Sequence, residues 1–233
     1  MKIIDKINEE YKPYIDIKKK NYYPNFFKTK TGEYGEGDIF IGVSVPNQRK
    51  VAKKNLEISF AQLQSLLQSP YHEHRLTALF ILVYKYKKNT DKKEIYDFYL
   101  KNINFINNWD LVDSSCDKIM GPYLFEKDKT ILYELSKSNN LWERRIAIIT
   151  TFYFIKNNKF TDTIQLSKIL LNDSHDLIHK AVGWMLREVG NRNLEEELSF
   201  LNKHYKQMPR TMLRYAIEKF PEELRKAYLK GQI

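Results

Sequence analysis

Hydrophobic residues recur with helical spacing along most of the chain. In three stretches, apolar side chains stand at positions i, i+4, i+7 and i+11, which places them on one face of a helix. The three stripes are Val112, Cys116, Ile119 and Tyr123; Trp142, Ile146, Ile149 and Tyr153; and Ile178, Val182, Met185 and Val189. The pattern predicts three helices of the same kind, each with one buried face.

These helices belong to a repeat. Strong helical stretches begin near His72, Asn108, Leu141, Asp176 and Pro209, at steps of 36, 33, 35 and 33 residues. Each interval also contains a shorter amphipathic segment: KEIYDFYLKNI, KTILYELSKS, TIQLSKILL and LEEELSFLNKHY. Two helices per step of this length are typical of an α-solenoid. We therefore expect an all-α, HEAT-like or armadillo-like superhelix of helical repeats over residues 47–233.

The first 46 residues differ from the rest. They contain four of the eight Gly and three of the seven Pro. The stretch TKTGEYGEGDIFIGVSVP predicts a flexible Gly-rich loop that leads into a helix at Pro46. We expect residues 1–46 to form an irregular or helical segment with this loop, within a single domain that spans residues 1–233.

Charge adds a functional indication. The chain has 39 Lys and Arg against 29 Asp and Glu, a formal charge of +10. The first 46 residues contribute +1, with 8 Lys against 7 acids, so the helical repeats contribute +9. This excess favours a polyanionic partner.

The single cysteine, Cys116, excludes an internal disulfide and a cysteine-based zinc module. We recognise neither a signal peptide nor a membrane span of about 18 residues, and expect a cytoplasmic protein.

Several side chains lie off the buried stripes. Trp184 shares a helix face with Lys180 and Arg187, which suits contact with a phosphate and the sugar next to it. The alternative is that Trp184 packs against a neighbouring repeat beside a solvated edge. Trp109 and Asp113, four residues apart, also share a face, although Asp113 could equally be an ion-paired surface acid.

Two further repeats supply cations. Arg145 precedes an apolar run, and Arg210 and Arg214 lie four residues apart in the last repeat. Equivalent faces of successive solenoid helices line one surface. The side chains that could converge there are Trp109, Asp113, Arg145 and Trp184.

Signals for a metal or cofactor are weak. His175 and His179 have the spacing of helical metal ligands but lack a third ligand, and His72 and His74 lie two residues apart at a helix start. The segment GEYGEGDIF lacks a complete phosphate-binding fingerprint. We expect no metal and no cofactor.

Four motifs resemble those of a known family. They are FIGVSVPNQR at 40–49, NWDLVDSS at 108–115, LWERRIAI at 141–148 and DLIHKAVGWMLREVG at 176–190. With them the chain resembles the DNA alkylation repair enzymes of the AlkD type, which are HEAT-like-repeat DNA glycosylases. The resemblance implies a superhelix whose concave basic face holds duplex DNA.

The resemblance also implies roles for single residues. Asp113 falls on the catalytic carboxylate of the family, Trp109 and Trp184 on its two active-site tryptophans, and Arg145 on its active-site arginine. Family DNA-contacting positions fall on Arg49, Arg187 and Arg214, and the helix faces described above add Lys180 and Arg210. Ser44 and Val45 depart from the family, which has polar residues there.

The proposed chemistry fits a single carboxylate. Glycoside hydrolysis ordinarily uses two, one of which protonates the leaving group. A purine alkylated at a ring nitrogen, such as 3-methyladenine or 7-methylguanine, already carries positive charge and needs no protonation. We therefore expect a monomeric, monofunctional DNA-alkylpurine glycosylase, a hydrolase of base excision repair. The alternatives are a non-catalytic HEAT-like module that binds DNA and a protein-binding scaffold.

Overall fold

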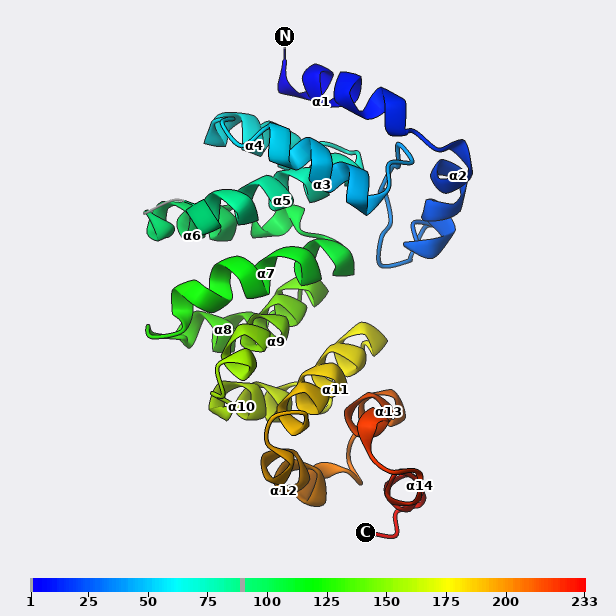
Figure 1. Cartoon of the computed structure of the whole chain (residues 1–233). Coiled ribbons are helices and arrows are strands. Elements are labelled where there is room, and N and C mark those ends of the chain that lie inside the picture. Colours follow the sequence, from blue (N-terminus) through cyan, green and yellow to red (C-terminus); the bar gives the residue numbers. More distant parts are fainter. Residues whose placement is uncertain (1, 89–90) are drawn as a thin grey trace. The chain divides into compact units, whose positions relative to one another are not determined.

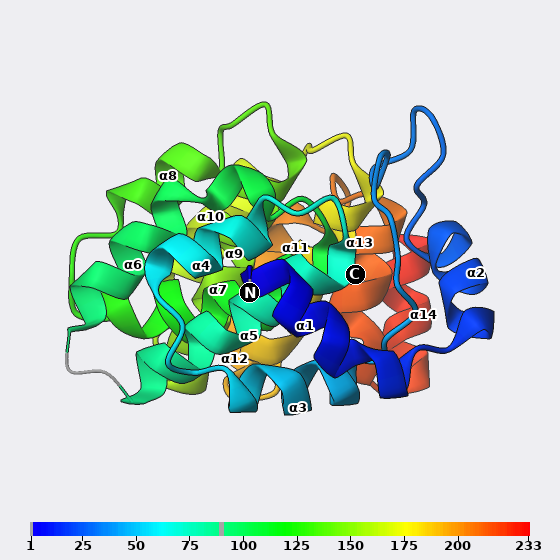
Figure 2. The ribbon, with the colours of Figure 1, turned by 90° about the horizontal axis from the view of Figure 1, so that it is seen from above.

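The computed structural model describes residues 2–88 and 91–233 (Figures 1 and 2). In this part of the chain there are fourteen α-helices, three short 3-10 helices and no β-strand, which confirms the predicted all-α class. The helices are α1 (Ile3–Tyr11), α2 (Ile17–Phe26), α3 (Val45–Lys54), α4 (Phe60–Leu67), α5 (His72–Lys88), α6 (Lys92–Lys101), α7 (Trp109–Leu124), α8 (Thr130–Leu135), α9 (Leu141–Lys156), α10 (Thr161–Ile169), α11 (Asp176–Gly190), α12 (Leu194–His204), α13 (Arg210–Ala216) and α14 (Glu222–Lys230).

The predicted repeat is present. Helices α5, α7, α9, α11 and α13 begin within one residue of the positions expected from the sequence, although α13 has only seven residues, and helices α6, α8, α10 and α12 fill the intervals. The predicted stripes are buried, except that Tyr123 and Tyr153 at their ends are half-buried. Cys116 is fully buried in its stripe, as a core thiol.

Contacts divide the chain into two compact units, one ending at Ser115 and the other formed by Cys116–Ile233. Helix α7 contributes its first half to the N-terminal unit and its second half to the C-terminal unit. The two units are described separately below.

Helix α5 is the centre of the N-terminal unit. Thirteen of its seventeen residues are buried. Helices α3 and α4 pack against α5, and α1 packs against α3 and α4 (Figures 1 and 2). The first turns of α5 bury polar and charged side chains, among them His72, Glu73 and Arg75. Buried charged groups require partners, and the loop before α3 provides them.

The C-terminal end of the Gly-rich loop is anchored to α5. The Glu73 carboxylate accepts hydrogen bonds from the backbone N–H groups of Ile41, Gly42 and Val43, at 2.8–3.3 Å. Gly42 has φ +98°, and a Cβ there would lie 2.4 Å from the Asp16 carbonyl oxygen. Only glycine meets both requirements, so this position fixes how closely the loop approaches α2.

In the C-terminal unit, α11 lies between α9 and α13 (Figure 1). Helices α8 and α10 pack against α9, and α12 packs against α11. A Cβ on Gly183 would lie 2.4 Å from the Met212 carbonyl oxygen and 2.6 Å from the Cβ of Tyr215. Glycine at this position therefore allows α11 and α13 to pack with their backbones in close approach. None of the described helices is both long and apolar enough to cross a membrane.

Candidate functional site

Helix α7 begins at the predicted catalytic motif. The Asn108 side chain accepts a hydrogen bond from the backbone N–H of Trp109 at 2.8 Å, and so fixes the start of the helix. Trp109 is half-buried and stacks on Phe27, with 5.7 Å between ring centroids. Asp113, also half-buried, follows one turn later on the same face of α7. Both residues therefore lie on one half-buried face of α7.

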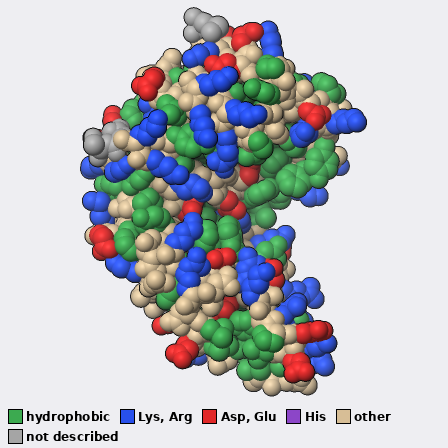
Figure 3. Space-filling model, viewed as in Figure 1, with side chains coloured by type: hydrophobic (Ala, Val, Ile, Leu, Met, Phe, Trp, Pro, Cys, Tyr) green, Lys and Arg blue, Asp and Glu red, His purple; other side chains and the backbone are tan. Residues whose placement is uncertain are grey.

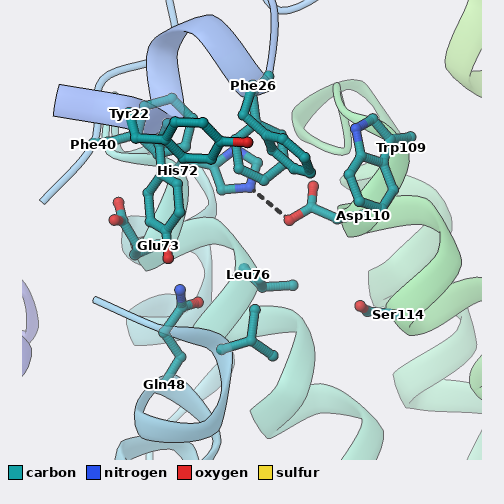
Figure 4. A pocket seen from close by; sticks show the side chains of 13 residues that line it. Tyr22, Phe26, Phe40, Gln48, His72, Glu73, Leu76, Trp109, Asp110 and Ser114 are labelled. Carbon is teal, nitrogen blue, oxygen red and sulfur yellow. Dashed lines mark hydrogen bonds and ion pairs between the residues drawn. The ribbon is translucent and has the colours of Figure 1, made fainter. Parts of the chain in front are cut away.

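A buried ionic network lies beside Trp109. The His72 ring bonds Asp38 through Nδ1 at 2.8 Å and Asp110 through Nε2 at 2.9 Å (Figure 4). Arg75 pairs with the same Asp38 carboxylate. The network links the Gly-rich loop, α5 and the start of α7, and so holds the backbone on either side of Trp109.

The network sets the charges of its members. Burial alone would lower the pKa of His72, but the carboxylates of Asp110 and Asp38 outweigh it and raise the pKa to about 9. Burial would raise the pKa of Asp38, but His72 and Arg75 outweigh it and hold the pKa below its ordinary value. At neutral pH, His72 is therefore a buried cation that donates from both ring nitrogens.

A cavity of about 350 Å³ adjoins this network in the N-terminal unit. Figure 4 shows its polar and aromatic side chains converging from α2, α3, α5, α7 and the Gly-rich loop. The lining residues are Tyr22, Tyr23, Phe26, Phe27, Phe40, Val45, Gln48, His72, Glu73, Leu76, Trp109, Asp110 and Ser114.

The C-terminal unit holds the other two predicted active-site residues. Arg145 on α9 is buried and donates from Nη1 to the Leu177 carbonyl oxygen. Trp184 on α11 is half-buried, with its ring centroid 5.4 Å from that of Phe152, and its Nε1 donates to Glu188 at 3.3 Å. Trp184 thus packs in part against α9. Because these residues and the α7 pair belong to different units, the convergence of all four remains a prediction.

The predicted DNA-contacting residues differ in their surroundings. Lys180 pairs with Asp176 at 2.7 Å, and Arg187 pairs with Glu218. The exposed Arg210 donates to the Leu229 carbonyl oxygen at 2.7 Å, and Arg214 is also exposed. The half-buried guanidinium of Arg49 lies 3.9 Å from the ring centroid of Phe80. Lys and Arg side chains are spread over the visible face of each unit (Figure 3).

The histidine pairs have structural roles. The ring of His175 accepts the backbone N–H of Leu177 at the start of α11. His74 bonds Ser69 and Asn8. In the described ranges 2–88 and 91–233, no group of three or more His, Cys, Asp or Glu is placed to hold a metal ion.

Sequence reasoning missed the residues around Trp109. Asp38, His72 and Asp110 come from three distant segments, and the aromatic residues of α2 from a fourth. The run NYYPNFF at 21–27 was an available signal, because so many aromatic side chains close together suggest a hydrophobic surface or a site. No pattern in the sequence indicated which residues would pair with the buried charges.

Comparisons with known proteins agree with the fold. A solved structure from Enterococcus faecalis, described as a predicted DNA alkylation repair enzyme, superposes with a TM-score of 0.70 at 14% identity. The match covers 89% of this chain and 97% of that one. No curated protein matches the sequence. The family described as DNA alkylation repair enzyme matches residues 7–220. The chain therefore belongs to the family of DNA alkylation repair enzymes.

Proposed function

We propose that the protein is a monofunctional DNA glycosylase. It hydrolyses the N-glycosidic bond of positively charged alkylated purines, such as 3-methyladenine and 7-methylguanine, in duplex DNA. The observation that carries the proposal is the pair formed by Trp109 and Asp113 on one half-buried face of α7. An indole and a carboxylate on one accessible face can both stabilise a sugar that gains positive charge.

The reaction breaks the bond between C1′ of the deoxyribose and the base nitrogen. The bonding electrons pass to the base and neutralise it, so no general acid is required. A carboxylate about 4 Å from the oxocarbenium-like sugar, at an effective dielectric constant of about 20, contributes roughly 4 kcal/mol. This corresponds to about three decades in rate. Water then attacks C1′ and loses a proton to the solvent, which completes the hydrolysis.

The other assigned residues serve the same step. Trp109 and Trp184 present their ring faces to the deoxyribose, and Arg145 holds a phosphate next to the lesion. Arg49, Lys180, Arg187, Arg210 and Arg214 bind further phosphates of the duplex. The network of Asp38, His72 and Asp110 positions the start of α7, which carries both Trp109 and Asp113.

Base release by an Asp113→Asn variant tests the proposal. We expect single-turnover release of 7-methylguanine from methylated duplex DNA to fall by about three decades, with DNA binding retained because asparagine has the same shape. Asp97→Asn on α6 is the matched control, since it removes the same charge from an exposed carboxylate. Equal release by wild type and Asp113→Asn would refute the catalytic role and favour a non-catalytic DNA-binding module.

A further inference from the structure

Contacts from two helices hold the indole of Trp184 in the C-terminal unit. On α9, the ring of Phe152 lies beside it, with 5.4 Å between the ring centroids. On α11 itself, Nε1 of Trp184 donates to Oε1 of Glu188, one helical turn later, at 3.3 Å. The first contact packs the indole against a neighbour, and the second gives its N–H group a polar partner.

Packing alone leaves the direction of the ring open. The outer torsion of a tryptophan side chain has broad, roughly two-fold preferences, so the ring can turn over while it stays in the same place. Because Trp184 is only half-buried, water could also satisfy its N–H group. The bond to Glu188 removes this freedom, since turning the ring over would take Nε1 away from the carboxylate.

Glu188 is itself held in place by Arg192. Its second oxygen, Oε2, accepts from Nη1 of Arg192 at 2.9 Å, and the same Nη1 donates to the Glu188 carbonyl oxygen at 2.9 Å. The two side chains are 18% and 27% exposed, whereas those of the surface pair Glu222 and Lys226 are 72% and 62% exposed. A partly buried ion pair is screened less than an exposed one. The acceptor is therefore fixed before it meets Trp184.

The neighbour on α9 is fixed as well. Nζ of Lys156 lies 3.7 Å from the ring centroid of Phe152 and 3.2 Å from the carboxylate of Asp117. Asp117 is buried, so this contact is anchored in the interior of the unit. Trp184 thus has one neighbour that supports its ring and one that sets its direction, and an ion pair holds each of them.

We propose that Glu188 is a positioning residue, which directs the face of the Trp184 ring toward the deoxyribose of bound DNA. The role of Trp184 rests on the proposed function, whereas the bond that sets its ring rests on the geometry of α11 alone. The effect of Glu188 is one of orientation, because its charge and that of Arg192 are opposite and largely cancel at a distance. Orientation matters for rate, since a misplaced positioning group can slow a reaction by up to about a hundredfold.

The indole N–H groups report the direction of the ring without any catalysis. The chain contains three tryptophans, so isotope labelling of their side-chain nitrogens gives three magnetic resonance signals, and Trp184→Phe identifies the one from Trp184. We expect Glu188→Ala to move this signal and to speed its exchange with water at least about fivefold, because the N–H group loses its acceptor. Glu188→Gln should keep the bond through its amide oxygen. An unchanged Trp184 signal in Glu188→Ala would overturn the proposal.

Base release and DNA binding are then measured separately. In single-turnover release of 7-methylguanine, we expect Glu188→Ala to be about ten- to hundredfold slower than wild type and Glu188→Gln to be within about threefold of it. The dissociation constant for duplex DNA should not rise in either variant, because each removes a negative charge.

Glu195→Ala is the matched control, since it removes the same side chain from an exposed position of α12, and it should match the wild type in both measurements. Two results would overturn the positioning role. One is an active wild type whose rate of release Glu188→Ala retains. The other is a Glu188→Gln variant that loses as much activity as Glu188→Ala, because the retained acceptor would then have no effect.

A further measurement separates this proposal from the proposed function. Duplex DNA that contains 7-methylguanine is added to the labelled proteins at equal occupancy. We expect it to shift the Trp184 signal in wild type and Glu188→Gln, and to leave the signal nearly unchanged in Glu188→Ala. A wild type that shows these shifts but releases no base would refute the glycosylase and still support Glu188 as the residue that directs Trp184. Equal shifts in wild type and Glu188→Ala would overturn the positioning role, whether or not the protein is active.

Discussion

His72 is a cation held inside the N-terminal unit by two carboxylates from segments 34 and 38 residues away. Neither partner could have been inferred from the sequence, where His72 resembles His74 two residues later. The structure separates them: the carboxylates of Asp110 and Asp38 raise the pKa of His72 to about 9, whereas burial lowers the pKa of His74 to about 4. By contrast, helical spacing alone predicted that Trp109 and Asp113 share one face of a helix.

The raised pKa of His72 predicts a loss of stability at alkaline pH. The folded pKa of about 9 exceeds the unfolded value of 6.5, so the stabilisation is complete below about pH 6.5 and is lost as the pH rises through about 9. The difference in free energy of unfolding between wild type and His72→Gln should therefore shrink by about 3 kcal/mol from about pH 6 to about pH 10. Chemical denaturation at both pH values measures it. A difference that does not depend on pH would contradict the buried ion pairs.

Glu197 on α12 predicts a second pH effect, in the other unit. Burial raises the pKa of its carboxyl group to about 8, against a smaller opposing effect of Arg187. The folded state therefore binds a proton that the unfolded state releases between about pH 4.5 and 8, and stability falls as the pH rises through this range.

Glutamine mimics the protonated form of Glu197. We expect Glu197→Gln to match the wild type near pH 5 and to be more stable near pH 9, by up to about 4 kcal/mol. Thermal or chemical unfolding at the two pH values measures the difference in stability. If a charged Glu197 instead stabilised the fold, Glu197→Gln would be less stable than the wild type at pH 9.

At the level of whole elements, sequence predicts some helices far better than others. The long helices after residue 71 bury a continuous apolar face, so their periodicity is visible in the sequence. Helix α2 has no such face: none of its ten residues, all of them described, is buried, and Pro24 lies inside it. It is fixed instead by its cap, where the Asp16 side chain accepts from the N–H groups of Lys18 and Lys19. The sequence therefore indicated only an irregular or helical segment there.

The contact of α11 with α13 depends on Gly183. Alanine is favoured over glycine inside a helix by about 1 kcal/mol, but its Cβ would lie 2.4 Å from the Met212 carbonyl oxygen. We expect the clash to dominate, so that Gly183→Ala lowers the free energy of unfolding by about 1–3 kcal/mol. Ser199→Ala, at an exposed position of α12, is the control for a small helix substitution. A Gly183→Ala protein as stable as the wild type would mean that the two helices separate without cost.

At the scale of the whole molecule, the main consequence of the formal charge of +10 is attraction to the phosphates of DNA. If Arg49, Lys180, Arg187, Arg210 and Arg214 each neutralise one phosphate, the plot of log K against log salt concentration has a slope of about −4.5. Arg214→Ala should make the slope shallower by about 0.9 and weaken binding to all duplexes alike. Lys203→Ala, an exposed cation on α12, is the control. Equal slopes for Arg214→Ala and wild type would remove Arg214 from the DNA-binding surface.

The anchored Gly-rich loop has a consequence for how the chain reaches its native state. In the C-terminal unit, side-chain bonds between neighbouring repeats join residues that are close to one repeat apart, 29 from Arg144 to Asp173 and 32 from Arg145 to Leu177. In the N-terminal unit, side-chain bonds join residues 66 apart, from Tyr11 to Thr77 and from Asn8 to His74, and 70 apart, from Asp38 to Asn108. Such distant contacts require larger loops to close, which slows folding. The N-terminal unit, which is synthesised first, is therefore expected to fold more slowly than the C-terminal unit.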